Sequence, residues 1–208
     1  IPEASPTHTA LERAAEARGW PCEKHILQPC PAIPLGGDWE SYLANIDKKQ
    51  RHEIRRKLRR AETGDPPIAW RIVGPEADIE AEVERFMALM ALDPNKAGFL
   101  TEAMRSQFRD SLRAAHTHGW LQLAWLTVEG KPAAGYLNFD YDSKLWIYNS
   151  ALDPAYGNLS VGWVLLAYLI RWAIENGRRE FDFMRGGEEY KLKFGGAPRR
   201  IYRLTLRR

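Results

Sequence analysis

Two carboxylates and a phenol near the C-terminus are the side chains best suited to move a proton. Asp182 lies in the run Phe181-Asp182-Phe183-Met184, and Glu188 and Tyr190 follow shortly after it. A carboxylate in a short buried strand is costly unless it is paired or used. Asp182 or Glu188 is therefore a candidate base or amine-orienting carboxylate. Tyr190 is a candidate acid toward a leaving group.

Each of these residues also has a structural explanation. Alternation along the strand places the two phenylalanines on one face and Asp182 on the other. Asp182 would then serve equally well in an ion pair with Arg185 or Lys191 that fixes the Arg185-Gly186-Gly187 loop. From the residues alone, Tyr190 fits better as a packing residue with a hydrated hydroxyl.

A turn of small and polar residues precedes the most apolar helix that the sequence predicts. The residues of this turn are Asn158, Leu159, Ser160, Val161 and Gly162. The first turn of a helix has unpaired N–H groups and the positive end of the helix dipole, which together attract phosphate. The alternative is simple capping by Asn158 or Ser160, with Gly162 incidental.

A third feature is the basic segment from Lys48 to Arg60. It carries eight Lys or Arg residues and one acid, Glu53. Only Ile54 and Leu58 give it an apolar stripe, so it is expected to be a surface helix. Such a run attracts RNA, anionic lipid headgroups or acidic substrates, unless it is only a solvated face.

Composition narrows the class of protein. The chain has 208 residues, 45% hydrophobic, with a formal net charge of +3, which is enough for one substantial core. Two cysteines, Cys22 and Cys30, do not make a disulfide framework, so a reducing cytoplasm is expected. No apolar run is long enough to span a membrane. No metal site is expected, because neither cysteine has partners at metal-binding spacing, and His116 and His118 point apart on one helix.

Periodicity and turn residues predict the elements that position these side chains. Helices are expected at 7–18, 39–46, 48–62, 77–92, 101–118 and 161–176, with a short one at 188–194. Strands are expected at 22–28, 68–73, 121–128, 132–141, 144–150, 180–184 and 201–206. Two-residue turns join the three strands between 121 and 150 into an antiparallel meander. This order predicts an α+β fold.

The basic segment and the stretch from Leu159 to Lys191 together resemble the GNAT-type acyltransferase domain. This domain occurs in FemAB-like proteins and in bacterial polysaccharide-biosynthesis acetyltransferases. The motifs that carry the resemblance are Lys48-Lys49-Gln50-Arg51-His52-Glu53-Ile54-Arg55-Arg56, Leu159-Ser160-Val161-Gly162 and Phe181-Asp182-Phe183-Met184-Arg185-Gly186-Gly187-Glu188-Glu189-Tyr190-Lys191. The chain has Gly187 where the family often has Asp.

The resemblance implies a mixed, mainly antiparallel central sheet with flanking helices. The meander would splay from the strand at 180–184 and leave a cofactor cleft. Residues 39–208 would form this domain, and residues 1–38 the tail of a preceding domain plus a Pro/Gly linker. Acetyl-CoA or another acyl-CoA would be the donor, with its pyrophosphate on the turn from Asn158 to Gly162. Arg185 and Lys191 would contact an anion and Tyr148 the substrate.

The implied activity is direct acyl transfer, without a covalent enzyme intermediate, to an amine or hydroxyl of a sugar or cell-envelope precursor. The turn lacks the glycines of the family's Gln/Arg-x-x-Gly-x-Gly/Ala pattern, so a FemAB-type aminoacyl-tRNA donor remains an alternative. The basic segment would then bind the tRNA. A third possibility is an inactive GNAT fold that binds a protein or an anionic membrane surface through that segment. The expected location is the cytoplasm, peripheral at the inner membrane face.

Overall fold

The computed structural model describes residues 1–207 and contains two compact units. Unit 1 comprises Ile1–Pro34 and the residues from Asp182 onward, and unit 2 comprises Leu35–Phe181. This grouping differs from the predicted boundary after residue 38, because the N-terminal segment folds with the C-terminal one. That residues 1–38 derive from a preceding domain stays a prediction.

The sheet of unit 2 has the strand order β7-β6-β5-β4-β3. The strands are β3 (Ile68–Ile72), β4 (Leu121–Val128), β5 (Lys131–Tyr141), β6 (Lys144–Leu152) and β7 (Glu180–Asp182). Strands β3 to β6 pair antiparallel with their neighbours, which confirms the predicted meander. In the turn between β5 and β6, Asp142 and Ser143 have φ values of 54° and 56°. Two consecutive positive φ values match a two-residue hairpin turn to the twist of its strands.

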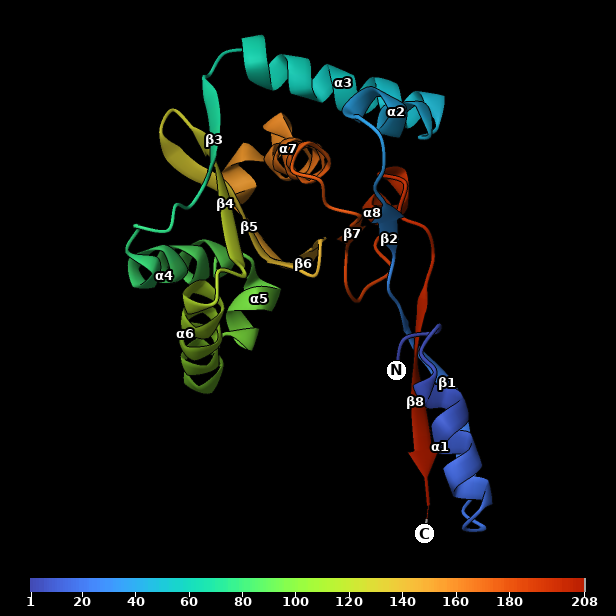
Figure 1. Ribbon diagram of the computed structural model, residues 1–208. Helices are drawn as coiled ribbons and strands as arrows, with labels where there is room; N and C mark the ends of the chain where they lie inside the picture. Colours follow the sequence, from blue (N-terminus) through green and yellow to red (C-terminus); the bar gives the residue numbers. More distant parts are fainter. Residues whose placement is uncertain (208) are drawn as a thin grey trace. The chain divides into compact units, whose positions relative to one another are not determined.

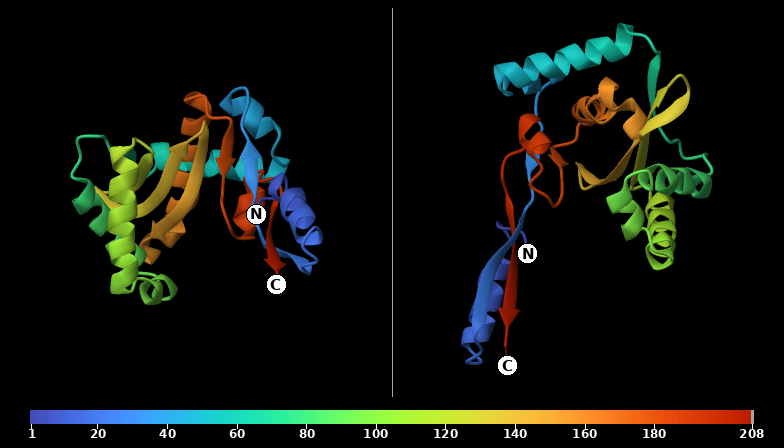
Figure 2. Two further views of the ribbon diagram at one scale, coloured as in Figure 1. Left: turned by 60° about the horizontal axis from the view of Figure 1, so that its bottom comes forward. Right: turned by 180° about the vertical axis from the view of Figure 1, so that it is seen from behind.

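Helices cover both faces of this sheet (Figure 1). The helical elements of unit 2 are α2 (Trp39–Ala44), α3 (Lys48–Thr63), α4 (Ile79–Met90), α5 (Pro94–Phe99), α6 (Glu102–Thr117), the 3-10 helix η1 (Pro154–Leu159) and α7 (Val161–Glu175). Helix α7 packs on β4, β5 and β6, while α4 and α6 pack on the other face. Helix α3 lies against the outer side of α7, as Figure 2 shows from two further sides. The α+β prediction is therefore confirmed.

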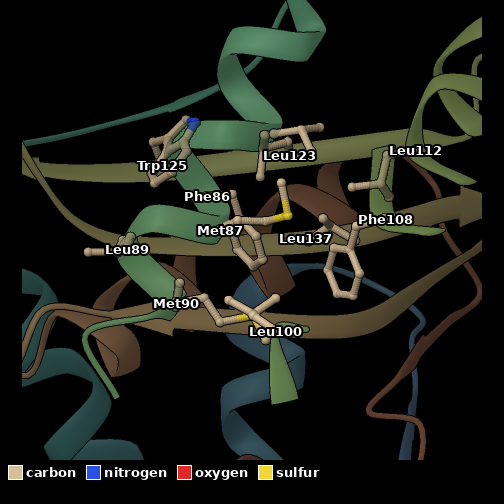
Figure 3. Packing of buried hydrophobic residues seen from close by; sticks show 12 residues of the cluster. Phe86, Met87, Leu89, Met90, Leu100, Phe108, Leu112, Leu123, Trp125 and Leu137 are labelled. Carbon is tan, nitrogen blue, oxygen red and sulfur yellow. The ribbon is translucent and has the colours of Figure 1, made fainter. Parts of the chain in front are cut away.

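The core between the sheet, α4 and α6 fixes the positions of these helices (Figure 3). Phe86 and Met87 of α4 and Leu137 of β5 are fully buried in it, and Phe108 and Leu112 of α6 are almost completely buried. Burying one such side chain contributes roughly 1.5–3 kcal/mol. The apolar positions predicted at helical spacing in α4 and α6 thus form the core.

Three elements of the described residues, α5, β2 and the 3-10 helix η1, were not predicted from the sequence. Helix α5 begins at Pro94, where Asp93 accepts a hydrogen bond from the Asn95 amide at 2.9 Å. An Asp cap followed by Pro at the first helical position is a good start signal, but Gly98 and the short length obscured it. Strand β2 (Ala32–Pro34) lies within the segment for which only a domain tail and a Pro/Gly linker were expected.

Unit 1 is built around an antiparallel ribbon of β1 (Cys22–Pro29) and β8 (Arg200–Leu206), with α1 (Thr7–Glu16) against β1. It also contains α8 (Glu189–Lys193). The ammonium of Ile1 donates to the Tyr202 carbonyl at 2.7 Å, so the N-terminal segment lies on the ribbon. Strand β7 ends at Asp182 rather than at the predicted Met184, because Met184 adopts a left-handed φ of 54°.

Candidate functional site

The predicted site residues are divided between the two units. Unit 2 carries the turn from Asn158 to Gly162, and Tyr148 on β6. Unit 1 carries the segment from Asp182 to Lys191. Each group is described within its own unit.

The turn from Asn158 to Gly162 leads from η1 into α7. Ser160 is the N-cap residue of α7 in a left-handed conformation, and its side chain makes no capping hydrogen bond. Side-chain capping therefore does not satisfy the amides of the first turn, and these amides are the groups that bind an anion. This favours the anion-site interpretation over simple capping.

The side chains of the turn are used mainly for packing. Leu159 and Val161 are buried. A Cβ on Gly162 would lie 2.9 Å from Leu152 Cδ2, so glycine lets the start of α7 approach β6. A ligand at this turn would therefore meet main-chain groups rather than side chains of these residues.

Two cations of α3 reach the same turn. Arg60 Nη1 donates to the Asn158 carbonyl at 3.2 Å. Lys57 Nζ lies 4.2 Å from the ring centroid of Trp163, in the first turn of α7. The basic segment and the turn, predicted separately, thus lie side by side at the N-terminus of α7. A phosphate group bound there could accept hydrogen bonds from main-chain amides and would be attracted by the two positive charges.

Strand β6 has a bulge at Tyr148 that was not predicted. Leu137 of β5 pairs with Asn149 and Asn138 pairs with Ile147, which leaves Tyr148 as the extra residue. Bulges often lie next to active sites, where they redirect a side chain. The ring of Tyr148 packs 5.5 Å from Phe139 and remains 41% exposed.

Beyond this bulge, side chains satisfy the main chain of β6. The amide of Ser150 donates to Asn149 Oδ1 at 2.9 Å, and its carbonyl accepts from Lys96 Nζ at 2.5 Å. In an antiparallel ladder both groups of one residue point the same way, so at Ser150 they point away from β5. In the described chain, this side of β6 therefore has no strand partner at Ser150.

Asp182 is buried and fully engaged in unit 1. Its Oδ1 accepts from the Met184 amide at 2.7 Å, and its Oδ2 lies 2.5 Å from Arg199 Nη2. The sequence pointed to Arg185 or Lys191 as its partner and not to Arg199, which is separated by the whole of α8. These contacts favour the structural ion pair over a proton-accepting role.

Lys191 is also buried, and it holds the Arg185-Gly186-Gly187 loop. Its Nζ donates to the carbonyls of Phe183, Arg185 and Gly186 at 3.3, 2.9 and 3.3 Å. The same ammonium lies 2.8 Å from a carboxylate oxygen of Glu188, whose side chain is 56% exposed. Lys191 thus has the contacts of a loop anchor. Glu188 is thus far more accessible than Asp182, and the neighbouring Glu189, with its side chain 79% exposed, is accessible as well.

Tyr190 is half-buried beside Phe183, with ring centroids 6.1 Å apart. Burial, with a smaller contribution from the Glu188 carboxylate, raises the pKa of Tyr190 to about 12. The phenol is therefore protonated at neutral pH, which is the state a proton donor needs. Arg185 is exposed at the surface of the loop.

The described residues contain no group of three His, Cys, Asp or Glu side chains that could hold a metal ion. None of the helices in residues 1–207 is both long and apolar enough to cross a bilayer. Cys22 and Cys30 are not joined in a disulfide.

A sequence profile for the acetyltransferase (GNAT) domain matches residues 48–192. The chain belongs to this family. A GNAT-type chain is a transferase, which confirms the predicted enzyme class. The match begins at the first residue of α3 and ends within α8, so it includes every candidate site residue named above.

Solved structures of known proteins share the fold. FemX superposes with a TM-score of 0.68 at 12% identity, covering 95% of this chain and 67% of FemX. The C-terminal domain of a protein described as a lysylphosphatidylglycerol synthetase, from Agrobacterium fabrum, gives 0.64 at 14% identity, covering 97% of this chain and 65% of that one. A GCN5-related N-acetyltransferase from Sphaerobacter thermophilus gives 0.50 at 18% identity, covering 99% and 58%.

At these identities the likeness concerns the fold, and it supports the FemAB-like form of the GNAT domain. The chain spans about two thirds of the length of FemX and of the Agrobacterium protein. A search of curated proteins finds no match.

Proposed function

We propose that this protein transfers an acyl group, in the simplest case acetyl, from acyl-CoA to an amine or hydroxyl of a sugar or cell-envelope precursor. The observation that carries the proposal is the N-terminus of α7, where uncapped helix amides meet Arg60 and Lys57 of α3. A diphosphate fits such a site through hydrogen bonds and charge.

The proposed reaction is one direct displacement. The acceptor nitrogen or oxygen forms a bond to the thioester carbonyl carbon, the carbon–sulfur bond breaks, and the acceptor loses a proton. Tyr190 would protonate the departing thiolate. Glu188 is the better candidate to orient or deprotonate the acceptor, because its carboxylate is accessible whereas both oxygens of Asp182 are engaged. Arg185 and Tyr148 remain the proposed substrate contacts.

Steady-state kinetics with acetyl-CoA test the donor site. Arg60→Met and Lys57→Met should raise KM for acetyl-CoA by roughly tenfold each, because each removes about 1.5 kcal/mol of charge-assisted bonding. Arg113→Met is the matched control, since Arg113 lies on α6 and pairs with Glu80 and Asp110. An unchanged KM in both α3 variants of an active enzyme would refute this donor site.

Aminoacyl transfer from tRNA is the second candidate, and two observations favour it. The cations of α3 extend along the helix from Arg60 back to Lys48. In addition, Lys96 and Asn149 already form hydrogen bonds with the main-chain groups of Ser150. The amide-bearing arm of CoA would have to compete with these two side chains for the same groups. Labelled aminoacyl-tRNA should then bind with a steep salt dependence. Absence of binding at low salt would exclude this donor.

An inactive fold that binds a protein or an anionic membrane surface is the third candidate. Calorimetry separates it from the first, because an acyl-CoA enzyme should show heat and a raised melting temperature with acetyl-CoA. Under each of the three candidates we place the protein in the cytoplasm, peripheral at the inner membrane face, where cell-envelope precursors are made.

A further inference from the structure

Unit 2 carries a partly exposed row of aromatic rings on β5, β6 and the residue before β4. We call these residues the aromatic strip: Trp120, Phe139, Tyr141, Trp146 and Tyr148. Trp120, Tyr141 and Tyr148 are 42%, 54% and 41% exposed, which is unusual for side chains of this size.

Strand register places Phe139, Tyr141 and Trp146 on one face of the sheet, and ring contacts join Trp120 and Tyr148 to them. Phe139 packs partly against the core on the α4 and α6 side, and Trp146 lies directly opposite it on β6. Tyr141 is two residues beyond Phe139, so its side chain leaves β5 on the same face. Trp120 lies edge-on to Tyr141, with ring centroids 5.0 Å apart. Tyr148 lies edge-on to Phe139, so the strip reaches the bulge of β6.

The strip is held rigidly. Trp146 Nε1 donates to the Tyr141 carbonyl at 3.2 Å, and the Trp120 carbonyl accepts from the Asp140 amide at 2.7 Å. The His118 ring lies 4.8 Å from that of Trp120. A ligand would therefore meet a preformed row of rings, with little ordering required on binding.

The charged groups beside the strip form pairs of opposite sign. Lys144, whose ammonium lies 5.3 Å from the Trp146 ring, pairs with Glu180 at 3.5 Å. At the hairpin tip Arg179 lies 3.8 Å from Asp142. This balance differs from the excess of cations on α3, and it suits a neutral ligand rather than a polyanion.

We propose that the aromatic strip binds a neutral saccharide, whose ring C–H groups pack on the exposed Trp and Tyr faces. Sugar rings have an apolar face and a hydroxyl rim, and flat aromatic side chains with nearby polar groups complement both. Its role as the acceptor site rests on the proposed function, because the strip reaches Tyr148, while saccharide binding itself does not depend on turnover.

Affinity electrophoresis of the full chain tests the proposal, in gels containing neutral soluble cellulose, chitin or mannan derivatives. At least one polysaccharide should retard the protein. Trp120→Ala/Tyr141→Ala should weaken the retardation about tenfold, as expected when two stacking rings are removed. The single variant Tyr141→Ala is included in case the double variant misfolds. Tyr141 lies at the end of the β5–β6 hairpin, so its replacement should leave the fold intact and still weaken the retardation. Phe99→Ala on α5, also 46% exposed, is the matched control and should change nothing.

Several outcomes would overturn the proposal. These are no retardation in any gel, equal retardation of the double variant, or binding to phosphatidylcholine–phosphatidylglycerol vesicles that the double variant loses. Self-association of the wild type that the double variant loses would overturn it as well. Saccharide binding without acyl transfer would support the strip and refute the proposed function. Full-rate transfer to sugar by the double variant would remove the strip from the acceptor site and leave the proposed function standing.

Discussion

Arg199 Nη2 and Asp182 Oδ2 lie 2.5 Å apart and join the two segments of unit 1 that precede and follow α8. The carboxylate is buried, whereas the arginine side chain is 40% exposed. Asp182 depends on this pair more than Arg199 does, because a buried carboxylate without a partner carries a large desolvation cost.

Arg199→Met and Asp182→Asn should therefore both destabilise the fold, by about 1–3 kcal/mol after allowance for the exposed side of the pair. Urea unfolding followed by tryptophan fluorescence measures this loss. Arg199→Lys should recover part of it. An Asp182→Asn protein that is fully stable but inactive would instead assign Asp182 a chemical role.

Tyr190→Phe should lower kcat by about 100-fold or more if the phenol protonates the leaving thiolate. The melting temperature should stay nearly unchanged, since the ring and its packing on Phe183 are retained. Tyr156→Phe in η1 is the matched control. Full turnover by Tyr190→Phe would rule out the acid role.

The pH profile provides an independent check on Tyr190. With a pKa near 12, the phenol stays protonated from neutral pH to about pH 11. Loss of its proton therefore cannot cause a fall in rate at pH 8–9. If such a fall occurs, it should persist unchanged in the residual activity of Tyr190→Phe.

The cations of α3 predict a salt-dependent interaction with polyanions. Lys48, Lys49 and Arg59 form no ion pair with any part of residues 1–207, so they are available to a ligand. Replacing all three with Ala should reduce the slope of log K against log salt for tRNA by about 0.7–0.9 for each phosphate that these side chains neutralise. Fluorescence anisotropy at several salt concentrations measures the slope. Arg109→Ala on α6, where Arg109 pairs with Glu84 and Glu102, should leave it unchanged.

Glu53 should make stability depend on pH in the acid range. Its hydrogen bonds from Arg56, helped by the charges of Arg56 and Lys57, lower its pKa to about 2. A lowered pKa stabilises the fold above the unfolded value of about 4.3, and this contribution fades as pH falls toward 2. Because the Glu53–Arg56 ion pair is largely solvated, its contribution to the free energy of unfolding should stay below about 1 kcal/mol. Wild type should exceed Glu53→Gln in stability at pH 7 and lose that advantage near pH 2, as measured by urea unfolding at both values.

The parts of the fold that follow local rules were predictable. The two-residue turns predicted the meander. The spacing of apolar residues predicted α4, α6 and the buried face of α3. The turn before α7 was found because small residues precede an apolar run. These signals lie within a few residues of the structure that they encode.

The remaining features depend on residues far apart in the sequence. Arg199 meets Asp182, and Arg60 meets Asn158, only because the chain folds back. The bulge at Tyr148 arises from a register shift between two strands, which alternation within one strand does not encode. The grouping of the first and last segments into unit 1 follows from the pairing of β1 with β8.

Lys96 has a consequence for solubility. An open strand edge is a template on which strands of other chains can assemble, and a lysine there is a common natural protection. Because Lys96 and Asn149 occupy the main-chain groups of Ser150, an incoming strand would have to displace a charged side chain before it could add to β6. These contacts thus protect the part of β6 at Ser150 against edge-to-edge aggregation.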